Sequence, residues 1–153
     1  MGFLCSLFGG SARKLLEQMR RDSDVIKMAV AHKLLPNFFR RFGQQRGYTI
    51  TAAVTNKLFG QIAPDHSKQD LEIAEQIATD ILKNDAEVRY AALMACRAIL
   101  LFEADRNTGN QIVVWDTIQW MSTIWTLPAD EATPNGIRKI ALTLHNKYMS
   151  EGG

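Results

Sequence analysis

The sequence predicts an all-α protein, a single-domain bundle of six or seven helices around a buried central helix at about residues 85–104. The first observation is the stretch Asp85–Glu103, in which Arg89 and Arg97 are the only charges between Val88 and Phe102. A helix that is apolar on nearly all sides must be surrounded. The most apolar part of this stretch, Tyr90–Phe102, is too short for a membrane span of about 20 residues and contains Arg97. The second is that helical apolar spacing recurs on both sides of it. The third is that no period of about 20–50 residues repeats, so a solenoid is not expected.

Size and composition fit one soluble domain, residues 1–153, with an apolar N-terminal segment (1–10) and a frayed tail (150–153). Apolar residues make up 46% and charged residues 22%, which is ordinary for a globular domain. The two cysteines do not suggest a disulfide framework, because Cys96 lies within the central apolar stretch and Cys5 near the start. We expect Cys96 to be a buried thiol with a raised pKa, in a protein of the reducing cytoplasm.

Charge is unevenly distributed along the chain. Residues 1–50 carry nine Lys and Arg against three Asp and Glu, a net of +6, whereas residues 51–105 carry five against nine, a net of −4. A basic first third is typical of proteins that bind an acidic partner, a membrane surface or nucleic acid. The simpler interpretation is that the basic helices pair with the acidic middle of the same chain.

The first long segment, residues 12–34, keeps a helical apolar spacing that Asp22-Ser23-Asp24 interrupts. Either one helix carries a polar turn there, or Ser23 caps a second helix. We expect Pro36 to end the helix, because proline lacks the N–H group that the helix needs. Pro36 then begins a short separate helix that stops near Gly43.

Two later segments suit either a helix or a strand. Residues 48–59 are rich in β-branched side chains, but Ile50, Val54 and Leu58 are spaced by four, so we favour a helix that stops at Gly60. Residues 111–115 read QIVVW and also suit a strand. We favour a helix there too, because the apolar spacing continues into the residues that follow.

Capping residues mark the ends of the other helices. Ser67, three residues before Asp70, predicts a helix start. We expect Asn84 to end that helix in the left-handed conformation and Asp85 to cap the central helix, which predicts a tight antiparallel hairpin. Thr133-Pro134 predicts the start of the last helix.

The first candidate site is the N-terminus, Met1-Gly2-Phe3-Leu4-Cys5-Ser6, which fits the loose N-myristoylation pattern with Gly2 as the acylated residue. Cys5 offers a second position for lipidation, and basic side chains follow in residues 13–21. One acyl chain together with basic residues anchors a protein stably to a membrane surface. The alternative is that the apolar residues of this segment close one end of the core.

The second candidate surface combines two aromatic rings with three arginines: Phe38, Phe39, Arg40, Arg41 and Arg46. Such residues contact nucleic-acid bases and phosphates or lie on an anionic membrane. No nucleic-acid-binding motif accompanies them, so we do not expect nucleic acid as the partner. The simpler interpretation places Phe38 and Phe42 in the core and the arginines in solvent.

The third candidate surface holds Trp115, Trp120 and Trp125. Their spacing of five rotates each by about 140° from the one before on a helix, so they cannot all face one core. Trp115 and Trp125 share the expected core face with Ile118 and Met121. Trp120 then remains exposed to anchor a protein partner or a second copy of the chain. The alternative is that neighbouring elements cover all three rings.

No motif of catalysis or metal binding is present. HExxH, CxxC, phosphate-binding loops and GxSxG are absent, and His32, His66 and His145 are far apart in the sequence. We therefore predict no cofactor, no metal and no catalytic residue. The sequence favours a small non-catalytic interaction module that binds a protein partner or itself. A peripheral membrane protein is the alternative, and an enzyme with an unrecognised site is the second alternative.

Overall fold

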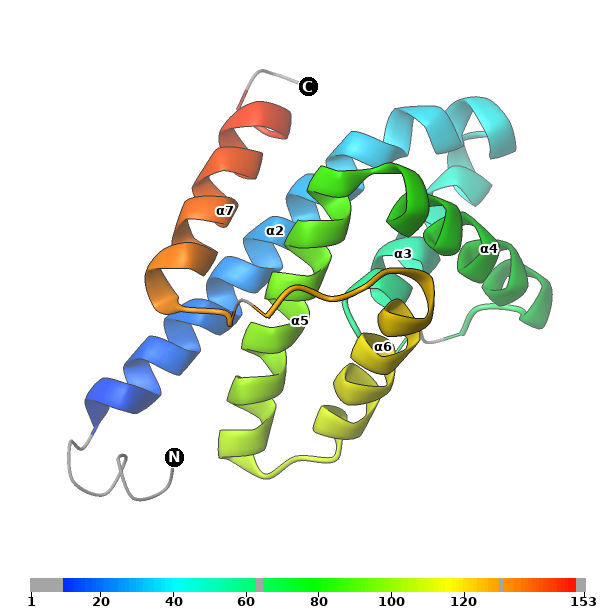
Figure 1. The fold of residues 1–153 in the computed structure, drawn as a ribbon. Helices are drawn as coiled ribbons and strands as arrows, with labels where there is room; N and C mark the ends of the chain where they lie inside the picture. Colours follow the sequence, from blue (N-terminus) through cyan, green and yellow to red (C-terminus); the bar gives the residue numbers. More distant parts are fainter. Residues whose placement is uncertain (1–9, 63–64, 130, 151–153) are drawn as a thin grey trace.

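The computed structural model describes residues 10–62, 65–129 and 131–150, and every regular element in those residues is an α-helix (Figure 1). Labelled as in Figure 1, these are α2 (Gly10–Phe42), α3 (Gln44–Leu58), α4 (Lys68–Asn84), α5 (Ala86–Arg106), α6 (Asn110–Ile124) and α7 (Pro134–Tyr148). The all-α prediction is confirmed. Both ambiguous segments are helical, since the first forms α3 and the second lies in α6.

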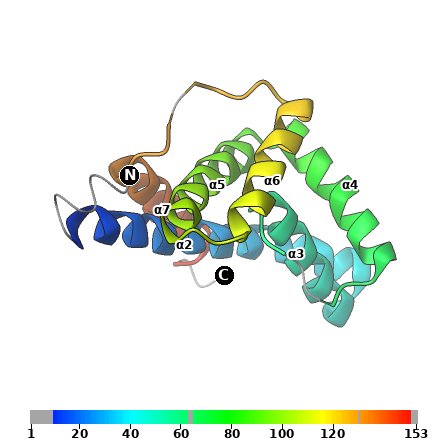
Figure 2. The ribbon, with the colours of Figure 1, turned by 90° about the horizontal axis from the view of Figure 1, so that it is seen from below.

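Helix α5 lies at the centre of the bundle and contacts α2, α4, α6 and α7 (Figures 1 and 2). Val88 and residues 91–96 are buried, as the apolar sequence predicts. Tyr90 and Leu101 are exposed, so one side of the helix reaches solvent. The expectation of a surrounded helix is therefore confirmed for the core faces and wrong for this side.

The two arginines of α5 satisfy backbone carbonyl groups of neighbouring segments. Arg89 donates a hydrogen bond of 3.0 Å to the carbonyl of Leu82 near the end of α4. Arg97 donates one of 2.9 Å to the carbonyl of Pro128 in the loop between α6 and α7. Each guanidinium thereby supplies a carbonyl with a donor that its own segment does not provide.

Helix α2 runs along one side of the molecule and contacts α3, α5 and α7 (Figure 2). Two pairs of contacts give the direction of α7: Arg138 meets Asp22, and Lys33 lies over the ring of Tyr148. Helix α7 is therefore parallel to α2. Helix α3 returns antiparallel to α2, because Tyr48 packs against Phe39 and Asn56 meets Lys27.

Helix α2 continues without a break through Asp22, Ser23 and Pro36, so the prediction that Pro36 ends it is wrong. Ser23 stays within the helix and donates its hydroxyl to the carbonyl of Met19 at 2.8 Å. Pro36 and His32 are both exposed, so water can satisfy the His32 carbonyl that loses its helical donor. Phe38, which is buried, holds the following turn against the core.

The junction of α4 and α5 is the single residue Asp85. Its N–H donates to the carbonyl of Ile81, and its side chain accepts from the N–H of Val88 at 3.1 Å. The cap is confirmed, but Asn84 is helical rather than left-handed. Asn107, after α5, does adopt the left-handed conformation. The two helices diverge from Asp85 in both views and form a corner, so the predicted antiparallel hairpin is wrong (Figures 1 and 2).

The other predicted helix starts and ends are confirmed. Ser67 and Thr133 cap α4 and α7 by accepting from the N–H groups of Asp70 and Gly136. Gly60, with a φ of +66°, ends the turn after α3 in the left-handed region. A Cβ at this position would lie 2.9 Å from the Cα of Val114, so the glycine also lets α6 approach this turn.

The basic first third and the acidic middle of the chain meet in the fold. Lys33 pairs with Asp85 at 2.6 Å, and Arg46 pairs with Asp70 at 3.1 Å. Arg13 lies 3.7 Å from Asp105. The interpretation that these charges pair within the chain is confirmed for these residues.

Candidate functional site

The structure reverses the expected roles of two tryptophans. Trp115 is 52% exposed, whereas Trp120 is half-buried and packs against the core. The Nζ of Lys57 lies 4.4 Å from the ring centroid of Trp120. Trp125 is half-buried beneath the guanidinium of Arg89, at 4.8 Å. The prediction that Trp120 is the exposed ring is therefore wrong.

The physical reason lies in the core face of α6. That face consists of Val114, Thr117, Ile118 and Met121. Trp115 falls about 100° beyond Val114 and so turns toward solvent. Trp125 lies just after the last helical residue, so it does not continue the apolar stripe along which the sequence had placed Trp115.

Two exposed apolar side chains lie on the outer face of α6. Ile112 is 62% exposed and stands one turn before Trp115 on the outer face. Ile62, in the connection between α3 and α4, is 67% exposed and lines a hollow together with Asn110 and Val113 of the first turn of α6. Val113 lies about 160° around α6 from Trp115, so Ile62 is on another flank of the helix. We call Ile112 and Trp115 the α6 apolar patch.

The Arg/Phe candidate is divided between core and surface. Phe38 is buried, and Phe39 packs edge-on against Tyr48 with ring centroids 4.8 Å apart. Arg41 and Arg46 both lie over the ring of Phe42, at 5.0 and 5.6 Å. Arg46 also pairs with Asp70, whereas Arg40 and Arg41 are exposed at the end of α2. The simpler interpretation is confirmed for the buried Phe38 and for the three exposed arginines, and Phe42 is half-buried and packs against the core.

The lipidation candidates Gly2 and Cys5 lie outside the described residues. Cys96 is buried, and burial raises the pKa of its thiol; the Sγ donates to the carbonyl of Leu58 at 3.3 Å. Among residues 10–62, 65–129 and 131–150, no three His, Cys, Asp or Glu side chains are grouped so as to hold a metal ion. None of the helices in these residues combines the length and apolar character that crossing a membrane requires.

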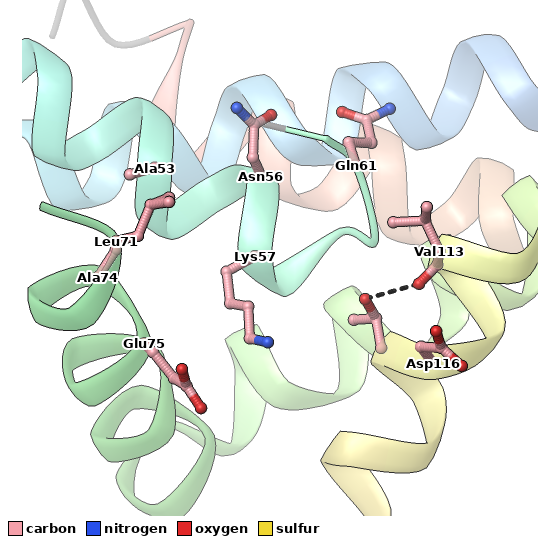
Figure 3. A pocket seen from close by; sticks show the side chains of 10 residues that line it. Ala53, Asn56, Lys57, Gln61, Leu71, Ala74, Glu75, Val113 and Asp116 are labelled. Carbon is pink, nitrogen blue, oxygen red and sulfur yellow. Dashed lines mark hydrogen bonds between the residues drawn. The ribbon is translucent and has the colours of Figure 1, made fainter. Parts of the chain in front are cut away.

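A hollow of about 420 Å³ lies between α3, α4 and α6, and we call it the interhelix pocket (Figure 3). Its polar lining consists of Asn56, Lys57, Gln61, Glu75, Asp116 and Thr117. The apolar lining consists of Ala53, Leu71, Ala74 and Val113. The side chain of Lys57 extends into the space between Glu75 on α4 and Asp116 on α6 (Figure 3). The pocket thus places one cation between two carboxylates.

Lys27 of α2 fixes two amide groups of this pocket from behind. Its Nζ donates to the Oδ1 of Asn56 at 2.6 Å and to the Oε1 of Gln61. Burial lowers the pKa of Lys27, and the nearby charge of Asp24 partly offsets this. Because both amide oxygens are occupied, the amide nitrogens of Asn56 and Gln61 remain as the groups that can donate elsewhere.

A second charged cluster joins α2, α5 and α7. The hydroxyl of Tyr148 donates to Glu87, and Lys147 lies 3.1 Å from the same carboxylate; the two hydrogen bonds lower the pKa of Glu87. Burial alone would raise the pKa of Asp85, but the hydrogen bonds from Lys33 and from the N–H of Val88 lower it overall. Burial alone would lower the pKa of Lys33, and its hydrogen bonds to Asp85 and Tyr148 raise it overall. All these charges have partners, so this cluster holds helices together.

The interhelix pocket was not predicted from the sequence. Lys57, Glu75 and Asp116 are too far apart in the chain for any spacing rule to connect them, and only the packing of three helices brings them together. The helical period of α4, which places Glu75 off the buried face, was the one sequence signal for its exposure. Comparisons of the chain with models of known families, with curated protein sequences and with solved structures found no match.

Proposed function

We propose that this protein is a protein-binding module that uses the α6 apolar patch. The observation that carries the proposal is the exposure of Ile112 and Trp115 on one face of α6, opposite its buried residues. A tryptophan exposes a large apolar area to water, and tryptophan is among the residues that most often dominate binding energy at interfaces. Trp120 and Trp125 pack against the core, which leaves Trp115 as the anchor.

The size of the patch favours a short apolar segment of a partner over a second copy of the chain. A stable interface of standard size uses about 20–30 residues from each side. The α6 apolar patch consists of Ile112 and Trp115, with the polar Asp116 and Gln119 beside them on α6. Such a surface can hold one or two apolar side chains of a partner inside a polar rim.

Site-specific photo-crosslinking in the native host tests this proposal. A benzophenone amino acid replaces Trp115 in one version of the full chain and Leu142, which is 50% exposed on α7, in the matched control. The proposal predicts that position 115 captures one defined protein and that position 142 does not. Equal capture at the two positions, or adducts of the chain with itself alone, would contradict it.

The Arg/Phe surface supports a second candidate, binding to an anionic membrane. Arg40 and Arg41 are exposed beside the half-buried ring of Phe42. Cosedimentation of the full chain with vesicles rich in phosphatidylserine tests it, since charge reversal of Arg40 and Arg41 should abolish binding that salt already weakens. Binding that persists in this variant would rule out the patch as the membrane contact.

A further inference from the structure

We propose that the interhelix pocket binds a small zwitterion of the size and class of a free amino acid with an apolar side chain. The proposal rests on the charges in the pocket and on its apolar wall. It uses other residues than the α6 apolar patch, since neither Ile112 nor Trp115 lines this pocket.

The charges in the pocket have no ionic partners among the described residues. Lys57, Glu75 and Asp116 take part in none of the ion pairs in that part of the chain. The ammonium group of Lys57 lies over the ring of Trp120, which holds the cation in place without neutralising it. A cation and two carboxylates that face one hollow without pairing match a ligand that carries both signs of charge.

The position of the charges indicates how such a ligand lies. Lys57 is half-buried, whereas Glu75 and Asp116 are exposed on opposite walls (Figure 3). A ligand carboxylate meets Lys57 inside the pocket, and the ligand ammonium meets Glu75 or Asp116 at the rim. The amide groups of Asn56 and Gln61 are turned toward Lys27 of α2, away from the ammonium group of Lys57 (Figure 3), so Lys57 is the group that meets the carboxylate.

The remaining wall is suited to an aliphatic side chain. Ala53 and Ala74 are buried, and Leu71 is partly exposed above them on α4. These residues lie together on the α3–α4 side of the pocket, beside Lys57 (Figure 3). The volume of about 420 Å³ falls within the range of about 300–1,000 Å³ that small-molecule pockets occupy. An aliphatic amino acid thus offers a carboxylate to Lys57, an ammonium group to Glu75 or Asp116, and an apolar side chain to the apolar wall.

Titration of the full-length, isotope-labelled protein with L-leucine, followed by NMR, tests this inference. We expect saturable shifts of the amide signals of Lys57 and Asp116 and of the indole N–H signal of Trp120. Leucinamide lacks the carboxylate and 4-methylpentanoate lacks the ammonium, so each should bind at least about tenfold more weakly, a loss of about 1.4 kcal/mol. This comparison uses the unaltered protein and does not depend on the folding of any variant.

Substitutions test which charged residues of the pocket bind leucine. Lys57→Met should weaken leucine binding at least about tenfold, and Asp116→Asn or Glu75→Gln should weaken it severalfold. Lys139→Met, on the exposed surface of α7, and Trp115→Ala should leave it unchanged. Three results would each overturn the inference: no saturable shifts up to about 10 mM leucine, an analogue that binds as tightly as leucine, or unchanged leucine binding in Lys57→Met.

Discussion

The two sides of α5 use their charged residues differently. We call the side formed by α2, α5 and α7 the paired side, because charged residues there join one helix to another. Asp22 pairs with Arg138, Lys33 pairs with Asp85, and Glu87 pairs with Lys147 and accepts from the hydroxyl of Tyr148. On the side formed by α3, α4 and α6, which we call the open side, Lys57, Glu75 and Asp116 face one another across a pocket without pairing. The same residue types therefore stabilise the fold on one side and remain available to a ligand on the other.

Packing holds the open side together. Leu58 and Phe59 at the end of α3, Leu82 of α4 and Met121 of α6 are fully buried. One ion pair, Arg46 with Asp70, does link α3 to α4, but Arg46 lies in the first turn of α3 and Lys57 in its last. Apolar burial stabilises by area and needs no particular charge. We therefore expect that substitution of the charged residues on the open side leaves the fold stable, whereas substitution on the paired side does not.

The largest effect that we expect is from Trp120→Ala. Truncation of a fully buried tryptophan to alanine costs about 3–5 kcal/mol. Because Trp120 is half-buried, we expect the free energy of unfolding to fall by about 2–3 kcal/mol. Urea denaturation followed by circular dichroism measures it. A loss below about 0.5 kcal/mol would show that aromatic packing does not hold α6 on the open side.

The next effect tests the paired side. Asp22 is buried, with Arg138 at 3.0 Å and Gln18 at 3.0 Å, and its Oδ2 has no partner among the described residues. Arg138→Met leaves this carboxylate without its cation. Removing one partner of a fully buried pair costs about 3–5 kcal/mol, and because Arg138 is itself exposed we expect about 2 kcal/mol.

The matched control for that variant is the next residue along α7. Lys139→Met removes an exposed lysine that forms no ion pair within the described residues, so its unfolding free energy should match that of the unaltered protein within about 0.5 kcal/mol. Equal losses in the two variants would mean that the pair with Asp22 contributes nothing specific.

A smaller effect depends on pH. The lowered pKa values of Glu87 and Asp85 stabilise the fold above their ordinary values of 4.5 and 3.8, and this stabilisation is lost as the pH falls below them. Tyr148→Phe removes the largest cause of the Glu87 shift, so it should cost about 1 kcal/mol at neutral pH and flatten the acid limb below about pH 4.5. Urea denaturation between pH 3 and 7 measures both changes. Tyr90→Phe, an exposed tyrosine of α5, is the control and should leave the acid limb unchanged.

The smallest effect on stability should come from Trp115→Ala. The ring is half exposed on the outer face of α6, so we expect a change within about 0.5 kcal/mol, similar to that of Leu142→Ala on α7. Partner capture should fall in the first variant and not in the second. A large loss of stability in Trp115→Ala would instead assign the ring to the core.

Local chemistry made much of the fold predictable from the sequence. Ser67, Asp85 and Thr133 cap helices because each side chain accepts from an N–H group three residues later, which depends on neighbours in the chain alone. The central helix was predictable from its own composition, because a helix that is apolar on nearly all sides must be buried, whichever segments bury it. These features therefore appear in the structure at the predicted residues.

Features that depend on distant residues were not predictable. Pro36 remains inside α2 because Phe38 is held in the core beyond it, and Trp115 faces solvent because the bundle buries Val114 instead. The interhelix pocket forms between three helices that are separate in the sequence, and no sequence motif indicates that they meet. Packing between segments decides all three cases, and no single segment contains that information.

The most direct test of the difference between the two sides is a triple variant of the open side, Lys57→Met/Glu75→Gln/Asp116→Asn, assayed for unfolding by urea and for leucine binding by NMR. The structure predicts an unfolding free energy within about 0.5 kcal/mol of the unaltered protein, together with loss of leucine binding. A loss of stability as large as that of Arg138→Met would contradict it, because these charges would then stabilise the fold as those of the paired side do.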